Sequence, residues 1–175
     1  MTKWIIDSSH SEVHFKVKHL VISTVTGSFN KFEGEVESTT DDFTNATIKF
    51  SADIDSIDTN NAQRDGHLKS PEFFDVTKHP KLEFVSTSFT KLNDSHYDLK
   101  GNMTVRGITH PIDMKVEYGG TTKDSYGNTR AGFELTGIIS RKEFGLTWSA
   151  VTEAGSVVVA DDVKLIVAVE LIKEA

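Results

Sequence analysis

Three arginines and three histidines are the residues of this sequence best suited to do chemistry as a group. They are His19, Arg64, His67, Arg106, His110 and Arg141. Arginine is charged at any physiological pH and can hold two oxygens of a phosphate or carboxylate, while histidine can change its charge near neutral pH. Brought together, the six would form a cationic collar suited to an anionic or polar group. The alternative is that they cap loops and pair with carboxylates, for which the candidates are Asp65, Glu72, Glu143 and Asp161.

Signals for catalysis or for a metal site are weak. The chain has no cysteine, which excludes a thiolate nucleophile, a disulfide and a cysteine-based zinc site. It also lacks the spacings H-x-x-E-H, H-E-x-x-H and G-x-S-x-G, and the phosphate-binding G-x-x-x-x-G-K. We therefore expect no catalytic residue, no cofactor and no metal. A glycosidase-like carboxylate pair stays open, because 26 acidic residues offer many pairs.

The overall charge excludes a common class of partner. Nineteen Lys and Arg against 26 Asp and Glu give a net charge of −7, whereas a nucleic-acid binder needs a basic footprint. The apolar run near the C-terminus, residues 165–169, is far shorter than the roughly 20 residues of a membrane-spanning helix. The first twenty residues contain no apolar core of a signal peptide, so we expect a cytoplasmic protein without an integral membrane segment.

The elements that must position the basic residues are predicted to be strands. Val, Ile and Thr number 16, 12 and 19, against nine each of Leu and Ala, and branching at Cβ favours the sheet. Alternating apolar and polar residues predict strands at 4–6, 13–19, 32–36, 46–54, 82–84, 97–105, 112–118, 133–139 and 163–171. One stretch, 60–69, breaks this pattern and is predicted to be a short helix with an Asn cap and Pro71 as its stop. Nothing indicates a second domain, so we expect one domain over residues 1–175.

Turn signals separate the expected strands. They are Thr26-Gly27, Asp41-Asp42, Asn93-Asp94, Gly119-Gly120 and Gly127-Asn128. If the sheet is an up-and-down meander, the links at 38–45, 91–95 and 119–129 fall at one end. The links at 19–27, 56–80 and 105–111 and the segment after Ile139 fall at the other, and this second end collects all six basic residues.

Eight or more antiparallel strands can form either a sandwich or a closed barrel. An eight-stranded barrel has room for one small ligand when side chains do not fill it. Small residues expected on the inward faces would either leave a cavity or fill a taper: Gly34, Ala46, Ala52, Gly101 and Gly137. The apolar residues expected to line such a cavity, or else an ordinary core, are Phe15, Val17, Phe29, Phe32, Ile54, Phe73, Phe74, Phe84, Met103, Met114, Phe133, Leu135, Phe144 and Trp148.

Several blocks of residues, in order along nearly the whole chain, resemble one known family. The blocks are 4–7, 10–19, 27–34, 56–59, 64–70, 73–75, 79–84, 101–111 and 139–145, of which Arg64-Asp65-Gly66-His67-Leu68-Lys69-Ser70 belongs to the most specific stretch. They resemble the YceI-like family of lipocalin-like, polyisoprenoid-binding proteins. Many members of that family begin with a secretory leader, whereas this chain starts directly at its first strand.

The resemblance implies an all-β fold, an extended eight-stranded antiparallel barrel with a short helical insertion at about residues 60–70. It also implies a homodimer and a long-chain amphiphilic lipid in an apolar pore: a polyisoprenoid, an isoprenoid phosphate or quinone, or a fatty acid or amide. The basic collar would then hold the head group. Two other readings stay open. One is an enzyme acting on a hydrophobic substrate with His19, His67 or His110 as acid or base, and the other is a stress-related interaction protein with a filled barrel.

Overall fold

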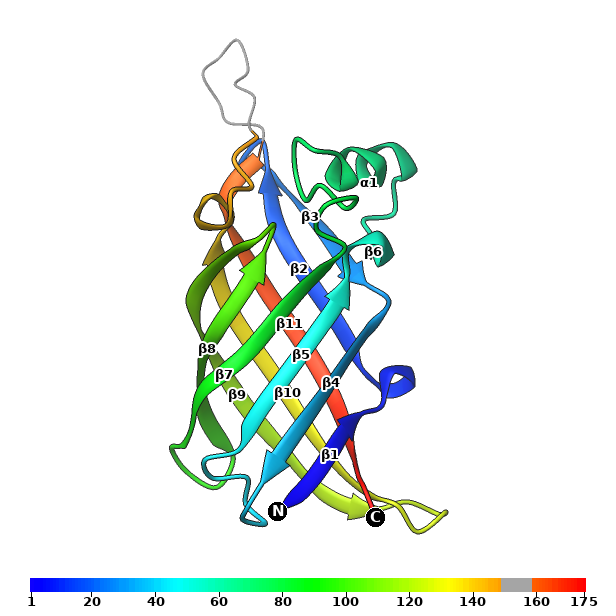
Figure 1. The fold of residues 1–175 in the computed structure, drawn as a ribbon, viewed down its shortest axis with the longest axis vertical. Coiled ribbons are helices and arrows are strands. Elements are labelled where there is room, and N and C mark those ends of the chain that lie inside the picture. Colours follow the sequence, from blue (N-terminus) through cyan, green and yellow to red (C-terminus); the bar gives the residue numbers. More distant parts are fainter. Residues whose placement is uncertain (149–158) are drawn as a thin grey trace.

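The computed structural model of the chain describes residues 1–148 and 159–175, which form a β-barrel with one α-helix (Figure 1). The strands are β1 (Thr2–Ile6), β2 (Glu12–His19), β3 (Ser23–Phe29), β4 (Phe32–Ser38), β5 (Thr47–Asp53), β6 (Ile57–Asp58), β7 (Lys81–Lys91), β8 (His96–Val105), β9 (Ile108–Lys123), β10 (Thr129–Ser140) and β11 (Val159–Lys173). The helix is α1 (Ala62–Lys69), and three 3-10 turns are η1 (Ser8–His10), η2 (Ile54–Ser56) and η3 (Arg141–Phe144).

Antiparallel pairing closes the sheet. The order β1-β4-β5-β7-β8-β9-β10-β11 returns to its start because β11 pairs with β1. The first half of β11 pairs instead with β2, and β2–β3 and β3–β6 continue the sheet there. Thus β1 and β2 are two parts of one barrel strand, as are β3 with β4 and β5 with β6. The expected eight-stranded antiparallel barrel with one short helix is confirmed.

Successive connections alternate between the two ends of the barrel, as an up-and-down order requires. The links β4–β5, β7–β8 and β9–β10 lie beside both chain termini, at what we call the terminal end (Figure 1). The β2–β3 hairpin, α1, the β8–β9 turn and η3 lie at the opposite end, called here the helix end (Figure 1). Arg64, His67, Arg106 and Arg141 lie in these connections at the helix end. His19 is instead the last residue of β2, and His110 lies near the start of β9.

Two of the expected turns are wrong. Thr26-Gly27 lies inside β3, and the turn before it is formed by residues 20–22. Gly119-Gly120 lies inside β9, where the register against β10 shifts between Gly132 and Phe133. In both places the glycine serves the strand itself: Gly27 makes room for a neighbouring ring, and the pair in β9 forms a bulge.

Helix α1 begins and ends close to where its sequence signals stand. The Asn61 side-chain oxygen accepts the Arg64 backbone N–H (3.0 Å), and the helix stops one residue before Ser70 and Pro71. No residue of the helix is fully buried. It is held by the partly buried Leu68, which packs against the core, and by polar bonds. Asp65 accepts hydrogen bonds from the Thr59 N–H (2.9 Å) and hydroxyl (2.5 Å), which tie α1 to the end of β6.

Aromatic side chains close the terminal end from within. The ring of Phe43, 1% exposed, lies 5.1 Å from those of Trp4 and Phe133, and Phe89 stacks on Tyr97 at 4.6 Å. These five residues are called the aromatic floor below. Phe43 belongs to the β4–β5 link, not to a strand, and turns inward from a backbone with φ +63°.

A charge cluster fastens the outside of the terminal end. Arg130 Nη1 lies 2.8 Å from Asp7 Oδ2 and 3.1 Å from Glu170 Oε1, and Nε lies 2.7 Å from Asp124 Oδ2. The hydrogen bond from Arg130 is the main reason that the pKa of Asp7 lies far below its usual range and that of Asp124 falls from 3.8 to about 2. One arginine thus holds together residues from β10, β11, the approach to η1 and the β9–β10 hairpin.

We expect Arg130→Met to flatten the acid dependence of stability. A carboxyl whose pKa is lower in the folded protein stabilises the fold above its unfolded pKa, and that contribution disappears as the pH falls through its folded pKa. For Asp124 this window runs from pH 3.8 down to about 2, and for Asp7 it extends lower. Urea-unfolding midpoints across this window measure the effect. Lys115→Met, which breaks an exposed pair with Asp98, is the control, and parallel profiles for Arg130→Met and wild type would contradict the assignment.

Candidate functional site

The barrel encloses two adjoining apolar cavities. The one nearer the terminal end, the inner chamber, has a volume of about 150 Å³, and the one nearer the helix end, the outer chamber, about 270 Å³. Four residues line both chambers: Phe29, Leu82, Met103 and Leu165. They come from β3, β7, β8 and β11 and lie where the two chambers meet, at what we call the waist.

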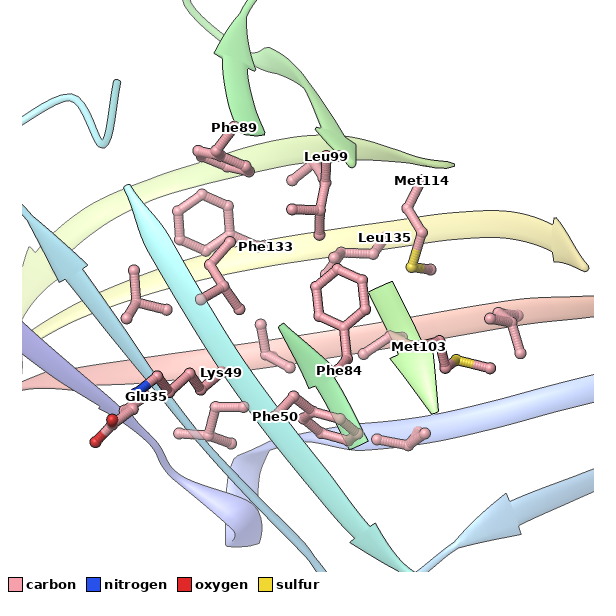
Figure 2. Close-up of a pocket in the computed structure, with 18 of the residues that line it drawn as sticks. Glu35, Lys49, Phe50, Phe84, Phe89, Leu99, Met103, Met114, Phe133 and Leu135 are labelled. Atoms are coloured by element: carbon pink, nitrogen blue, oxygen red, sulfur yellow. The ribbon is translucent and has the colours of Figure 1, made fainter. Parts of the chain in front are cut away.

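The inner chamber is a hydrocarbon-lined space. Its lining residues are hydrophobic except for Glu35 and Lys49, which are cross-strand neighbours on β4 and β5. Figure 2 shows these two together at the edge of the cavity, with Phe89 and Phe133 of the floor among the other labelled side chains. Strand alternation produces this lining, because every second residue of each strand faces the interior.

The two volumes set the length of the hydrocarbon tail that the chambers can hold. A dry protein cavity of about 150 Å³ lined by Leu, Ile and Phe accommodates benzene, or about six carbons. On that scale the inner chamber takes about six carbons and the outer chamber about ten, for a chain of about sixteen in all. A polar group of the same ligand would then lie at the helix end.

Inward-facing glycines keep large rings flat against the wall. A Cβ at Gly27 would lie 2.2 Å from Phe15 Cζ, and one at Gly101 would lie 2.4 Å from Phe84 Cζ. Each ring therefore occupies the space above a glycine instead of pointing into the lumen. These glycines do not create the cavity by their own small size. They create it because each provides space in which a neighbouring aromatic ring can lie.

Most of the apolar residues proposed from the sequence line one or both chambers. Those on the outer chamber are Phe15, Val17, Phe29, Phe73, Phe74, Met103, Phe144 and Trp148. Those on the inner chamber are Phe29, Phe84, Met103, Met114, Phe133 and Leu135.

Phe32 and Ile54 line neither chamber and are corrections to that set. The Phe32 ring packs against Phe50 instead, with 6.0 Å between ring centroids. Ile54 is buried, but it begins η2, where the backbone leaves the strand and its inside–outside alternation.

The six basic residues do not form one collar. Four of them line the outer chamber, namely His19, Arg64, His67 and Arg141, whereas Arg106 and His110 do not. Arg106 donates to the carbonyl oxygens of Gly145 (2.7 Å) and Pro71 (2.9 Å). His110 lies beside Glu143, with Nδ1 3.3 Å from Oε2. These two therefore fasten loops at the helix end.

The hydrogen-bond donors of Arg141 are also used within the protein. Its side chain is buried and donates to the carbonyls of Ala160 (2.9 Å), Leu146 (2.5 Å), Trp148 (2.7 Å) and Val159 (3.3 Å). Burial is the larger influence on its guanidinium and lowers the pKa, against the opposing effect of Asp161. With four carbonyl oxygens bound, Arg141 holds a loop in place, and its expected contact with a head group stays a prediction.

Arg64 and His19 are the basic residues of the outer chamber that keep a hydrogen-bonding group without a partner in the described part of the chain. Arg64 Nε and Nη2 donate to the hydroxyl (2.8 Å) and carbonyl (2.6 Å) of Thr59, which leaves Nη1 without a partner in the described part of the chain. The His19 ring makes no hydrogen bond or ion pair within residues 1–148 and 159–175, although it lines the chamber. His67, by contrast, has Nε2 2.6 Å from Glu72 Oε2.

Sequence reasoning missed other lining residues. Lys18 and Thr59 add polar atoms to the outer chamber, and Phe43 and Phe89 are part of the inner one. Strand alternation was a usable signal for Phe89 and for Leu165 of β11. Phe43 had no such signal, because it follows the turn residues Asp41-Asp42.

The described residues hold neither a metal-binding cluster nor a membrane-spanning helix. In residues 1–148 and 159–175, no cluster of three or more His, Cys, Asp and Glu could hold a metal ion. In the same part of the chain, no helix has the length and apolar character to span a bilayer.

A closed up-and-down barrel of eight strands around an apolar cavity places the protein in the lipocalin-like class of folds. The chain belongs to the YceI-like domain family, whose model matches residues 4–171. A UPF0312 protein of Pectobacterium atrosepticum is 39% identical over 172 residues, which is 96% of this chain and 84% of that protein. The crystal structure of the Campylobacter jejuni YceI protein is 28% identical, with a TM-score of 0.77 over 90% of both chains.

A third comparison shows the fold alone. The structure of a polyisoprenoid-binding domain from Saccharophagus degradans covers 98% of both chains with a TM-score of 0.73, at 13% identity.

Proposed function

We propose that this protein binds one long-chain amphiphilic lipid, with the tail in the inner and outer chambers and the head group at the helix end. The observation that carries the proposal is the pair of apolar chambers joined at the waist of Phe29, Leu82, Met103 and Leu165. Burial of hydrocarbon contributes about 0.8 kcal/mol per CH₂ group, so a tail that fills both chambers has ample gross driving force. The fold shared with the polyisoprenoid-binding domain of S. degradans supports the same class of ligand.

The capacity of the cavity narrows the ligand class. A tail of about sixteen carbons fits a fatty acid, a fatty amide or a short isoprenoid, whereas a long polyisoprenoid would extend beyond the chambers. The proposal is carriage and not catalysis. Of the three histidines considered as acid or base, His110 lies outside both chambers and His67 is paired with Glu72, while His19 lines the outer chamber with no carboxylate beside it in the described part of the chain.

Extraction of the purified protein tests the proposal. Native mass spectrometry of gently purified protein should show one bound amphiphile per chain, and its organic extract should contain that molecule in stoichiometric amount. A protein that carries no lipid, and that takes up none when titrated with a long-chain fatty acid or alcohol, would contradict the proposal.

Arg64→Gln should weaken an anionic lipid selectively. Arg64 lines the outer chamber, and its Nη1 has no partner in the described part of the chain. A hydrogen bond to a charged group is worth about 1.5–3 kcal/mol, or roughly a tenfold to hundredfold loss. A neutral alcohol of the same chain length should bind with unchanged affinity. Titration of both ligands measures the difference, and Arg106→Gln, outside the chambers, is the matched control. Equal losses for the charged and the neutral lipid would show that Arg64 only braces Thr59.

A further inference from the structure

The tip of the β2–β3 hairpin has a composition that the fold does not explain. Its turn runs from His19 to Ile22, with the Ile22 N–H bonded to the His19 carbonyl (3.3 Å). The two central residues, Leu20 and Val21, have φ +52° and +66°. A tight hairpin turn with both central φ values positive favours Asn-Gly, and a β-branched residue there is strained.

The same tip exposes two large aliphatic side chains to solvent. Val21 is 72% and Ile22 is 85% exposed, and they are consecutive in the chain. Side chains this exposed contribute little to the core, and the strain at Val21 costs stability. A strained residue that does not serve packing points to a function at that place.

The tip stands at the lipid-cavity end of the molecule. His19, the first residue of the turn, and Lys18 before it line the outer chamber. The hairpin lies at the helix end, away from both termini (Figure 1). Whatever the tip contacts is therefore brought close to the outer chamber.

Two exposed lysines, one on β2 of the hairpin and one on the neighbouring β11, add a charge preference. Lys16 on β2 lies directly opposite Lys164 on β11, a like-charge arrangement that weakens a sheet. Within residues 1–148 and 159–175, neither lysine has a carboxylate within ion-pair distance. The start of β11 also carries Asp161 and Asp162, of which Asp161 is paired with Lys142 (3.3 Å). The positive charge is therefore modest, and the aliphatic tip carries most of the expected affinity.

We infer that the β2–β3 tip is a docking element for an anionic lipid bilayer, with Val21 and Ile22 inserted among the lipids and Lys16 and Lys164 facing the head groups. Exposed aliphatic side chains at the tip, with lysines farther along the strands that have no carboxylate partner in the described residues, match the two layers of such a surface, hydrocarbon below and negative charge above. Docking there would place the outer chamber at the membrane. This inference does not depend on which lipid the barrel holds.

Vesicle flotation of the full chain tests the inference. The protein should bind vesicles of equal parts phosphatidylcholine and phosphatidylglycerol, and bind pure phosphatidylcholine more weakly. Val21→Gly/Ile22→Ser should lower binding at least about tenfold, given the free energy of burying two aliphatic side chains. Its thermal midpoint should equal or exceed that of the wild type, because glycine relieves the strained turn. Lys16→Gln/Lys164→Gln should weaken binding to the mixed vesicles only.

Two controls separate docking from its alternatives. Ile5→Ser/Val85→Ser removes two exposed aliphatic side chains from an outer face of the barrel and should leave vesicle binding unchanged. Met103→Trp, which narrows the waist, should also leave it unchanged, so that docking is distinguished from uptake of a lipid into the barrel. Absence of vesicle binding by the wild type, or equal losses for the tip variant and the Ile5→Ser/Val85→Ser control, would overturn the inference.

Discussion

Replacing Met103 with tryptophan should remove most of the preference for long-chain over short-chain lipids. Met103 is one of the four waist residues, and a larger ring there would separate the inner chamber from the outer one. A tail confined to the outer chamber loses burial of about six carbons, each worth about 0.8 kcal/mol, which predicts a loss of at least about a hundredfold. A short alcohol that fits the outer chamber should bind Met103→Trp as it binds the wild type.

Calorimetric titration with one short and one long alcohol measures this selectivity. Met103→Leu conserves the side-chain volume and should keep the wild-type preference, whereas overpacking by tryptophan costs stability of about 1–3 kcal/mol. The thermal midpoint of each variant is therefore measured beside its affinities. A folded Met103→Trp protein that still prefers the long alcohol would show that the two chambers do not form a single site.

The second large effect is expected at Arg141. Arg141→Met should destabilise the protein by about 3 kcal/mol or more, since four carbonyl oxygens lose their shared donor and unsatisfied buried groups cost about 1–3 kcal/mol each. Urea unfolding measures the change. Arg106→Met, which frees only the carbonyls of Gly145 and Pro71, should have a smaller effect.

A different result for the Arg141→Met variant would assign Arg141 to ligand binding. If Arg141→Met left the free energy of unfolding unchanged and weakened only anionic lipids, its guanidinium would be a head-group contact. The geometry favours the structural role, because the guanidinium is buried among the backbone oxygens of Leu146 and Trp148 and those of Val159 and Ala160 at the start of β11.

The sequence predicts the barrel well because alternation is a local signal. Leu165 and Val167 on β11, like Leu99 and Met103 on β8, face inward for the same reason. Each can be identified from its own strand, without knowing which strands pair with it. The helix is equally local, since Asn61 and Pro71 mark its limits in the chain.

The role of the arginines was much harder to predict. A guanidinium suits a phosphate and a backbone carbonyl equally well, and residue type does not distinguish them. The carbonyl partners of Arg106 come from Pro71 and Gly145, 35 and 39 residues away, and no sequence motif marks a backbone oxygen. Glycine was ambiguous in a similar way. Glycine is a residue typical of turns, but Gly27 lies in a strand, where the absence of a side chain makes room for the ring of Phe15.

The aromatic floor has a consequence for the rate at which a ligand leaves. Because Trp4, Phe43, Phe89, Tyr97 and Phe133 pack across the terminal end, we expect a lipid bound as proposed to leave tail-last through the helix end. Every methylene of the tail that lies in the inner chamber must then pass the waist on the way out. At about 0.8 kcal/mol per CH₂, each added carbon would lengthen the residence time up to roughly fourfold until the inner chamber is full. Beyond that length the floor stops the tail, and further carbons would no longer slow release.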